Sequence, residues 1–156
     1  MNEINEPYLF QTGKHAGEYL EELIFKNPDY IISLNNYRKG KNINRLQNHL
    51  EALLENTPRY KKICPICGER TAKYFLFLNH EDINKNLVCC ENYLCQTELK
   101  INHPQDYLLP IKLKTALSFR SKRLTKEALR LIKEAVGIRK INANEIFSIF
   151  IGEQIK

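Results

Sequence analysis

The stretch LVCCENYLC, Leu87–Cys95, holds three cysteines, and the stretch CPICG, Cys64–Gly68, holds the other two of the five in the chain. The N-terminus, MNEINEPYLF, carries two glutamates and no basic region, so we expect a cytoplasmic protein without a secretory signal. In a reducing compartment, clustered cysteines bind metal more often than they form disulfides. Two thiolates from each of two tight turns suit the tetrahedral coordination of zinc. The sequence therefore predicts one closed zinc site between these stretches.

The neighbouring residues Cys89 and Cys90 compete for one place in such a site. Side chains alternate between the two faces of a strand, so only one of the two cysteines can face the metal directly. Four residues separate Cys90 from Cys95, and five separate Cys89 from Cys95, so both alternatives stay open on spacing. We expect His80 and His103 to be exposed polar side chains and not ligands.

The pattern of a Cys-x-x-Cys turn followed by Cys-x-Asn-Tyr resembles the zinc ribbons at the C-termini of bacterial topoisomerase I. Its second half, Cys-x-Asn-x-x-Cys, is also similar to phage Ogr/Delta-type transcription activators. The resemblance covers about thirty-five residues, and it indicates metal binding more specifically than it indicates a function. In both families the asparagine follows the cysteine by two residues, which selects Cys90 here. The resemblance implies one structural Zn²⁺ held by Cys64, Cys67, Cys90 and Cys95, with Cys89 as a small apolar residue facing the other side.

A second motif is the sequence TGKHAGEYLEEL, Thr12–Leu23, followed by NPDYI, Asn27–Ile31. Residues of about 9–34 resemble the exodeoxyribonuclease X-like C-terminal module, although Ala16 and Glu18 stand where that family favours lysines. The resemblance implies a small α/β module that contacts nucleic acid or a protein partner.

The expected contact residues of this motif are Lys14 and His15, which a backbone turn would present to a phosphate or a partner. The alternative is a structural turn in which the glycines adopt positive φ and His15 packs against Tyr30. The motif is not a Walker loop, because it lacks the longer span that ends in Gly-Lys-Ser/Thr.

Changes in residue composition along the chain divide it into three segments, residues 1–57, 58–105 and 106–156. The first segment is predicted to be a helical module with a short strand, the second a zinc-ribbon hairpin and the third a set of basic helices. The predicted fold class is α+β. Helices are expected over residues 18–26, from Pro28 onward, and over 43–54, 112–124, 126–136 and about 143–154. Thr125 is the expected N-cap of the helix over 126–136, and Gly137 is expected to end it. Asn142 is the expected N-cap of the last helix, with Glu145 in the position of a capping box. Strands are expected over 71–78 and 86–90, with the polar loop NHEDINKN between them.

Positive charge increases along the chain. Residues 1–57 hold six Lys/Arg and eight Asp/Glu, residues 58–105 hold seven and five, and residues 106–156 hold eleven and five. A basic surface attracts polyanions, so nucleic acid is the expected partner. The expected contacts are to the nucleic-acid backbone, and DNA is favoured over RNA. The candidate residues are Lys73, Lys85, Tyr93, Arg120, Lys122, Arg123, Lys126, Arg130 and Lys133.

The sequence thus predicts a non-enzymatic, zinc-containing nucleic-acid-binding accessory protein. The alternative is a zinc-stabilised adaptor that binds proteins through its N-terminal module, and a diverged nuclease is less favoured because no strand carries Asp-x-Glu. No run approaches about eighteen apolar residues, so we expect no membrane partner, and we expect no small-molecule substrate. A bacterial or phage setting is implied only by the resemblances.

Overall fold

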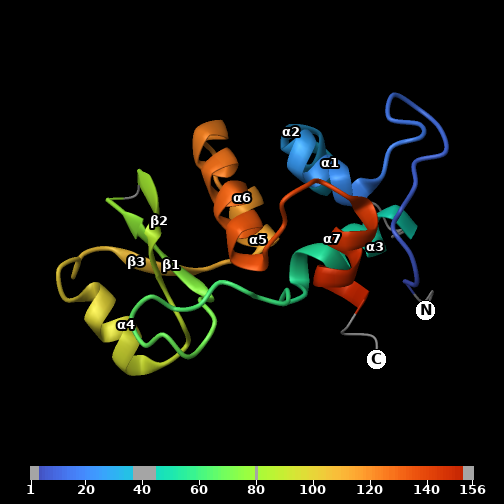
Figure 1. The fold of residues 1–156 in the computed structure, drawn as a ribbon. Coiled ribbons are helices and arrows are strands. Elements are labelled where there is room, and N and C mark those ends of the chain that lie inside the picture. Colours follow the sequence, from blue (N-terminus) through green and yellow to red (C-terminus); the bar gives the residue numbers. More distant parts are fainter. Residues whose placement is uncertain (1–3, 37–44, 80, 153–156) are drawn as a thin grey trace. The chain divides into compact units, whose positions relative to one another are not determined.

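The computed structural model describes residues 4–36, 45–79 and 81–152 (Figure 1). The fold class is α+β, as predicted, with helices and an antiparallel sheet. The chain forms two compact units, which we call the helical unit (Met1–Pro58 with Ile138–Lys156) and the cysteine unit (Arg59–Gly137). This grouping divides the predicted third segment at Gly137. Among the described residues, no helix is both long and apolar enough to cross a membrane.

The helical unit contains α1 (Leu20–Lys26), α2 (Pro28–Asn36), α3 (Arg45–Glu55), α7 (Ala143–Phe147) and a π-helical turn, η1 (Ser148–Gly152). Helix α1 contacts α2 and α7, and α3 contacts α2 and η1. Their inward faces bury apolar residues, among them Leu20, Ile24, Leu50, Leu53 and Phe150. The predicted helices from Pro28 and over residues 43–54 are confirmed, apart from residues 43 and 44, which lie outside the described residues.

The glycine motif forms a tight turn before α1. Residues on either side of it pair through a bridge between Leu9 and Tyr19, and the amide of Gly17 donates to the carbonyl of Phe10 (2.8 Å). Gly13 and Gly17 have φ values of 85° and 87°, a conformation that glycine adopts without steric cost. The turn therefore depends on both glycines.

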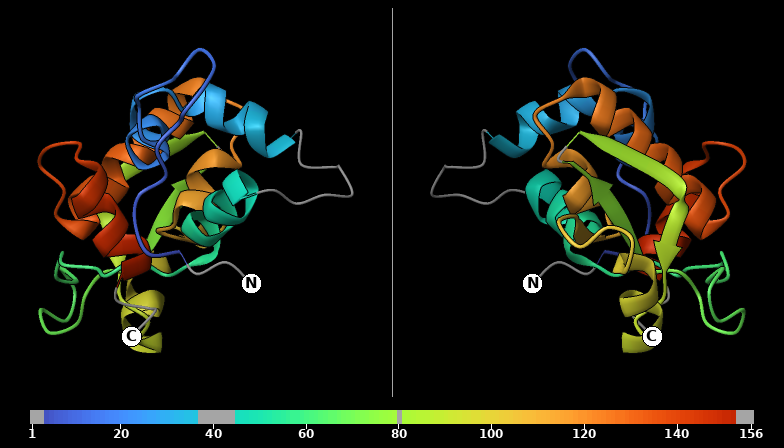
Figure 2. Two further views of the ribbon diagram at one scale, coloured as in Figure 1. Left: turned by 90° about the vertical axis from the view of Figure 1, so that its right-hand side faces the viewer. Right: turned by 90° about the vertical axis from the view of Figure 1, so that its left-hand side faces the viewer.

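The cysteine unit contains β1 (Tyr74–Leu78), β2 (Asp82–Cys89), α4 (Tyr93–Lys100), β3 (Tyr107–Pro110), α5 (Leu113–Leu117) and α6 (Lys122–Val136). The sheet is antiparallel with the order β2-β1-β3, so β1 is the central strand (Figure 2). Helix α6 packs against β2 and α5. Strand β3 was not predicted, because it is short and ends in proline, which is tolerated at the edge of a sheet.

Successive residues of β1 are buried on both faces of the sheet. Phe75 and Leu76 point to opposite sides and both are almost inaccessible to solvent. Phe75 lies opposite Val88 on β2 and Leu109 on β3. The Phe75 ring therefore belongs to the core.

The predicted loop over residues 79–86 is wrong for most of its length, because β2 begins at Asp82. The pairing with β1 shifts register between Phe75, which faces Val88, and Phe77, which faces Ile83. The extra residues of β2 form a bulge in which the amide of Asn86 donates to Asn84 Oδ1 (2.9 Å). A bulge with polar side chains has the composition of a loop, which explains the error.

Helix α6 begins earlier than predicted. Thr125 is not its N-cap but lies buried inside it, and Ser121 caps it by accepting from the amide of Leu124 (3.3 Å). The predicted end is confirmed, because Gly137 has φ 79° and closes the helix in the left-handed conformation. The predicted helix over 112–124 is confirmed over Leu113–Leu117 but is not continuous, because α5 ends at Leu117 and Ser121 caps the next helix, α6.

The last predicted helix is confirmed at its start. Asn142 caps α7 by accepting from the amide of Glu145 (3.0 Å), as the capping-box pattern indicates. The α-helix ends at Phe147 and continues as the wider turn η1 to Gly152, while residues 153 and 154 lie outside the described residues.

Candidate metal centre

The first cysteine turn is held by backbone hydrogen bonds within a small hairpin. The amide of Cys64 donates to the carbonyl of Arg70 (2.7 Å), and the amide of Gly68 donates to the carbonyl of Cys64 (2.9 Å). Gly68 has φ 69°, which lets the chain reverse just after Cys67. Both thiols of the CPIC sequence therefore lie on the same side of one rigid turn.

The second cysteine turn joins the end of β2 to the start of α4. Asn92 caps α4 by accepting from the amide of Leu94 (2.9 Å), and its own amide donates to the sulfur of Cys90 (3.4 Å). Cys95 lies in the first turn of α4 and faces inward. Asn92 thus connects the helix start with the orientation of one thiol. Helix α4 was not predicted, because its apolar and polar residues are only weakly separated onto two faces of the helix.

The two turns bring four thiols together. The sulfur atoms of Cys64, Cys67, Cys90 and Cys95 all lie within 4.8 Å of one another, and those of Cys67 and Cys90 are 3.9 Å apart. In a tetrahedral zinc site with Zn–S bonds of about 2.3 Å, neighbouring sulfurs are separated by about 3.8 Å. The four thiols could therefore hold a tetrahedral metal ion. Four thiolates would complete its coordination and leave no position for a substrate.

Cys89 is buried beside this group but is not part of it. It packs in the same apolar cluster as Cys90, as part of the wall behind the four thiols. Burial, together with the nearby sulfur of Cys64, raises the pKa of Cys89 to about 12, so its thiol stays protonated at neutral pH. His103 lies outside the four-thiol group and pairs with Asp106 (3.4 Å), and His80 lies outside the described residues.

Cys67 is the most accessible of the four thiols. Backbone amides of Arg70 and Glu69 donate to its sulfur and lower its pKa to about 7. By contrast, burial raises the pKa of Cys90. The first turn is thus prepared to supply a thiolate, whereas Cys90 must release its proton when a metal ion binds.

The division into two units separates the charges of the chain. The cysteine unit holds fifteen Lys/Arg and eight Asp/Glu, a net charge of +7, and the helical unit holds nine and ten, a net charge of −1. All the candidate nucleic-acid-binding residues belong to the cysteine unit. The exposed ones are Lys85, Tyr93, Arg120, Lys122, Arg123, Lys126 and Arg130, while Lys73 and Lys133 are half-buried.

Two of these cations are held by acidic groups. The guanidinium of Arg123 donates to the carbonyl of Glu81 (2.6 Å) and pairs with Glu127 (3.1 Å) and Asp82 (3.3 Å), which ties α6 to the turn of the hairpin. Lys73 pairs with Glu91 (3.4 Å). Arg123 therefore has a structural role that the sequence did not indicate.

Two other cations come together from different elements. Lys85 on the bulge of β2 and Arg130 on α6 line the same hollow of about 310 Å³. Glu127 and Glu134 also line it, but Glu127 pairs with Arg123, and Glu134 pairs with Lys62 (3.1 Å). The acids of the hollow are thus balanced by neighbouring cations, which leaves Lys85 and Arg130 as its surplus charge.

The glycine motif places its two candidate contacts in different environments. Lys14 is exposed, whereas His15 is buried with its ring 4.3 Å from that of Tyr30. The Nδ1–H of His15 donates to Glu18 Oε2 (2.5 Å), and its Nε2 is buried without a partner among the described residues. This packing matches the structural turn described above, in which His15 faces the interior.

A second buried histidine was missed at the sequence level. The Nε2–H of His49 on α3 donates to Glu21 Oε2 on α1 (2.5 Å), and the amide of Tyr8 donates to Glu21 Oε1 (3.0 Å). Glu21 is 0% exposed and His49 is 4% exposed. Because the partners lie 28 residues apart, no local pattern could reveal the pair.

Comparisons with protein-family models, with curated proteins and with solved structures find no match to this chain. The resemblances to zinc ribbons and to the exodeoxyribonuclease X-like module therefore stay predictions.

Proposed function

We propose that the protein is a zinc-stabilised nucleic-acid-binding accessory protein that acts by binding and not by catalysis. The observation that carries the proposal is the concentration of a +7 net charge on the unit that contains the four thiols. In this proposal one Zn²⁺, held by Cys64, Cys67, Cys90 and Cys95, orders a unit of about eighty residues and takes no part in chemistry. DNA is the favoured polyanion.

The contact surface of this proposal is a basic stripe on α6 in which Lys122, Lys126 and Arg130 are exposed and Lys133 is half-buried. Lys122, Lys126, Arg130 and Lys133 recur at three- and four-residue spacing and share one side of the helix. Lys85 extends the stripe beyond α6, because it lines the same hollow as Arg130. Cations in such an arrangement contact phosphates and do not read base sequence, so binding should be sensitive to salt and tolerant of sequence.

The test measures the affinity of the zinc-loaded chain for a short duplex and a short single strand between 50 and 200 mM salt, by fluorescence anisotropy. The double variant Lys126→Glu/Arg130→Glu should weaken binding by at least about tenfold and lower the salt slope by about two. The control Arg139→Glu/Lys140→Glu changes the net charge equally on exposed residues of the helical unit and should have little effect. A flat salt response, or equal losses in both double variants, overturns the proposal.

One observation favours a second function, that of an adaptor that binds a protein partner. Helix α4 and the residue that follows it expose large apolar side chains: Tyr93 is 77%, Leu94 74% and Ile101 72% exposed. Tyr93 and Ile101 also line a groove of about 640 Å³. Exposed apolar residues that gather on one face often mark an interaction surface. Nuclease-resistant capture of a defined partner, lost in Leu94→Glu/Ile101→Glu while nucleic-acid affinity stays unchanged, would establish this role.

A further inference from the structure

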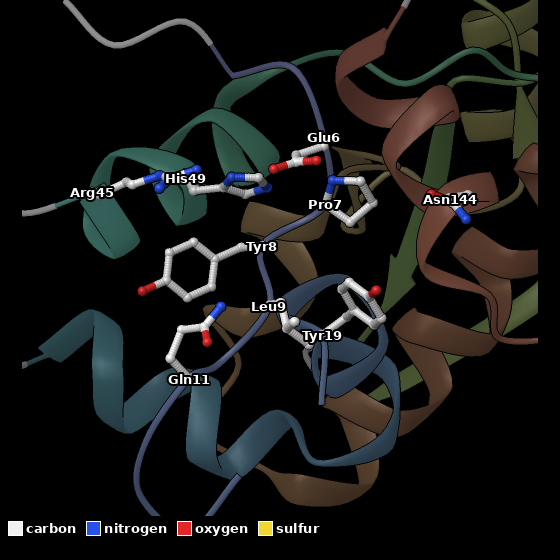
Figure 3. Close-up of a pocket in the computed structure, with 9 residues that line it drawn as sticks. All are labelled: Glu6, Pro7, Tyr8, Leu9, Gln11, Tyr19, Arg45, His49 and Asn144. Carbon is white, nitrogen blue, oxygen red and sulfur yellow. The ribbon is translucent and has the colours of Figure 1, made fainter. Parts of the chain in front are cut away.

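The helical unit contains a pocket that neither the metal centre nor the basic stripe explains. It has a volume of about 330 Å³ and lies where the N-terminal segment passes α3 and α7. Figure 3 shows Arg45 and His49 on α3 at one side, Asn144 on α7 at the other, and the segment that carries Glu6 and Tyr8 between them. Side chains with hydrogen-bonding groups provide most of its lining.

One buried carboxylate fixes two walls of this pocket. Glu21 is fully buried behind it and accepts from the amide of Tyr8 and from Nε2–H of His49. The backbone of the N-terminal segment and the ring of His49 are therefore held by the same group. The ring of Tyr8 also packs edge-on against that of His49, with centroids 5.7 Å apart. A pocket whose walls are fixed in this way is prepared for a ligand before it binds.

The α3 side of the pocket suits an anion. Arg45 and His49 lie one helical turn apart on the same face, and the first turn of α3 contains Arg45 and no acidic residue. The guanidinium of Arg45 can bind a phosphate through two parallel charge-assisted hydrogen bonds. The Nε2–H of His49 is already donated to Glu21, so the imidazole can add a donor to the phosphate only in its protonated form.

The rest of the pocket suits the other parts of a nucleotide. Tyr8 and Tyr19 provide aromatic rings, Asn144 provides an amide that can both donate and accept, and Glu6 provides a carboxylate that can accept from hydroxyl groups. Ligand pockets span about 300–1,000 Å³, so a volume of about 330 Å³ lies at the small end of that range and suits a ligand of about the size of one nucleotide.

We propose that this pocket binds a single phosphorylated nucleotide, with the phosphate at Arg45 and His49 and the nucleoside between Tyr8, Tyr19 and Asn144. Two sources can supply this chemistry, a free nucleoside monophosphate and the phosphorylated end of a nucleic-acid strand. The inference is independent of the function proposed for the cysteine unit, because every lining residue belongs to the helical unit.

The first experiment titrates the zinc-loaded full-length chain with the four nucleoside monophosphates, the matching nucleosides and inorganic phosphate, by calorimetry. At least one monophosphate should bind at least about tenfold more tightly than its nucleoside and than phosphate alone. Its binding should shift the ring resonances of His49 and leave those of His103, in the other unit, in place. Absence of binding at millimolar nucleotide, or equal affinity for phosphate and nucleotide, overturns the proposal.

The second experiment uses variants and strand ends. Arg45 is exposed, so Arg45→Gln should fold normally and weaken nucleotide binding by at least about tenfold, whereas the exposed control Arg139→Gln should not. A 5′-phosphorylated oligothymidylate that binds more tightly than its 5′-hydroxyl form only when Arg45 is present identifies a strand end as the source. Equal binding of both oligonucleotides identifies the free monophosphate. Equal losses in both arginine variants overturn the proposal. The α6 double variant above, Lys126→Glu/Arg130→Glu, should leave the affinity for a free monophosphate unchanged.

Discussion

Glu21 and Glu22 are adjacent residues of the same type on α1, and they lie in opposite environments. Glu22 is partly exposed and pairs with Lys26 one turn later (2.9 Å), whereas Glu21 is fully buried against His49 and the amide of Tyr8. A buried carboxylate must be paired and hydrogen-bonded to remain in the interior, and Glu21 meets both conditions. A shift of one position along the helix thus decides whether a glutamate lies at the surface or accepts buried hydrogen bonds that hold other segments in place.

We expect Glu21→Ala to lower the free energy of unfolding of the helical unit by about 3–5 kcal/mol, because it leaves the polar groups of His49 and Tyr8 buried without their partner. Glu22→Ala should cost less than about 0.5 kcal/mol, since it removes only a surface pair. Both losses can be measured by urea unfolding, with hydrogen exchange of the amides in α1 and α3 as the readout for the helical unit. Equal losses would show that Glu21 is not a structural centre.

At the metal centre, Cys89 and Cys90 provide a second comparison of neighbours. Cys90→Ala should abolish stoichiometric zinc binding, because one of four thiolates is lost, whereas Cys89→Ala should keep one zinc per chain. The Cys89 thiol, with a pKa of about 12, should also resist alkylation in the folded protein. Elemental analysis and mass spectrometry after alkylation check both points. If Cys89→Ala loses zinc and Cys90→Ala keeps it, Cys89 is the ligand and Cys90 is not.

At the scale of single elements, the start of α4 serves both the helix and the metal centre. Asn92 caps the helix, and Cys95 occupies the first turn of that helix, so fraying of the cap would displace a metal ligand. Leu99, one turn after Cys95, packs against the cysteine cluster, while Tyr93 and Leu94 face outward. The helix therefore connects the position of one thiol to a packed apolar face.

We expect Asn92→Ala to destabilise the cysteine unit by about 1 kcal/mol and to weaken zinc binding several-fold, because the cap of α4 is lost. Asn92→Asp is the matched control, since aspartate caps a helix equally well and its backbone amide can still donate to Cys90. Competition with a chromogenic chelator measures the affinity. A loss of the same size in Asn92→Asp would show that capping is not the reason.

At the scale of the whole chain, the interiors of the two units contain different kinds of side chain. The helical unit buries a set of large apolar side chains, among them Leu20, Ile24, Ile31 and Phe150. In the cysteine unit, the buried cluster around the four thiols consists of cysteines, whereas an ordinary core would contain large apolar side chains at such positions. A bound metal ion would contribute its binding free energy to folding, so this region would depend on the metal for its stability.

We expect a strong chelator to unfold the cysteine unit and to leave the helical unit folded. Amides of β1 and α4 should then lose protection against hydrogen exchange, whereas amides of α1 and α3 should keep it. The readout is exchange mass spectrometry of the full-length chain before and after chelation, with zinc addition as the reversal. Unchanged protection in β1 and α4 after complete metal removal would contradict a structural role for the metal.

The elements most clearly expected from the sequence are those that local physics controls. The apolar spacing of α1 and α3, Pro28 at the start of α2, the Asn142 cap and the Gly137 terminus depend on residues a few positions apart. The wrong boundaries arose where context overrides composition. The polar bulge of β2 is stabilised by its neighbour β1, and Ser121 caps α6 although Thr125 has the same capping chemistry.

By itself, the sequence determined that the protein is α+β, that two short cysteine turns can supply four thiols, and that its positive charge lies in its C-terminal two thirds. These properties follow from residue types and short spacings. Only the tertiary structure decided which thiols gather within 4.8 Å, which cations are neutralised, and that Glu21 meets His49 from 28 residues away. Contacts between distant residues depend on how the elements pack, and no local pattern contains that information.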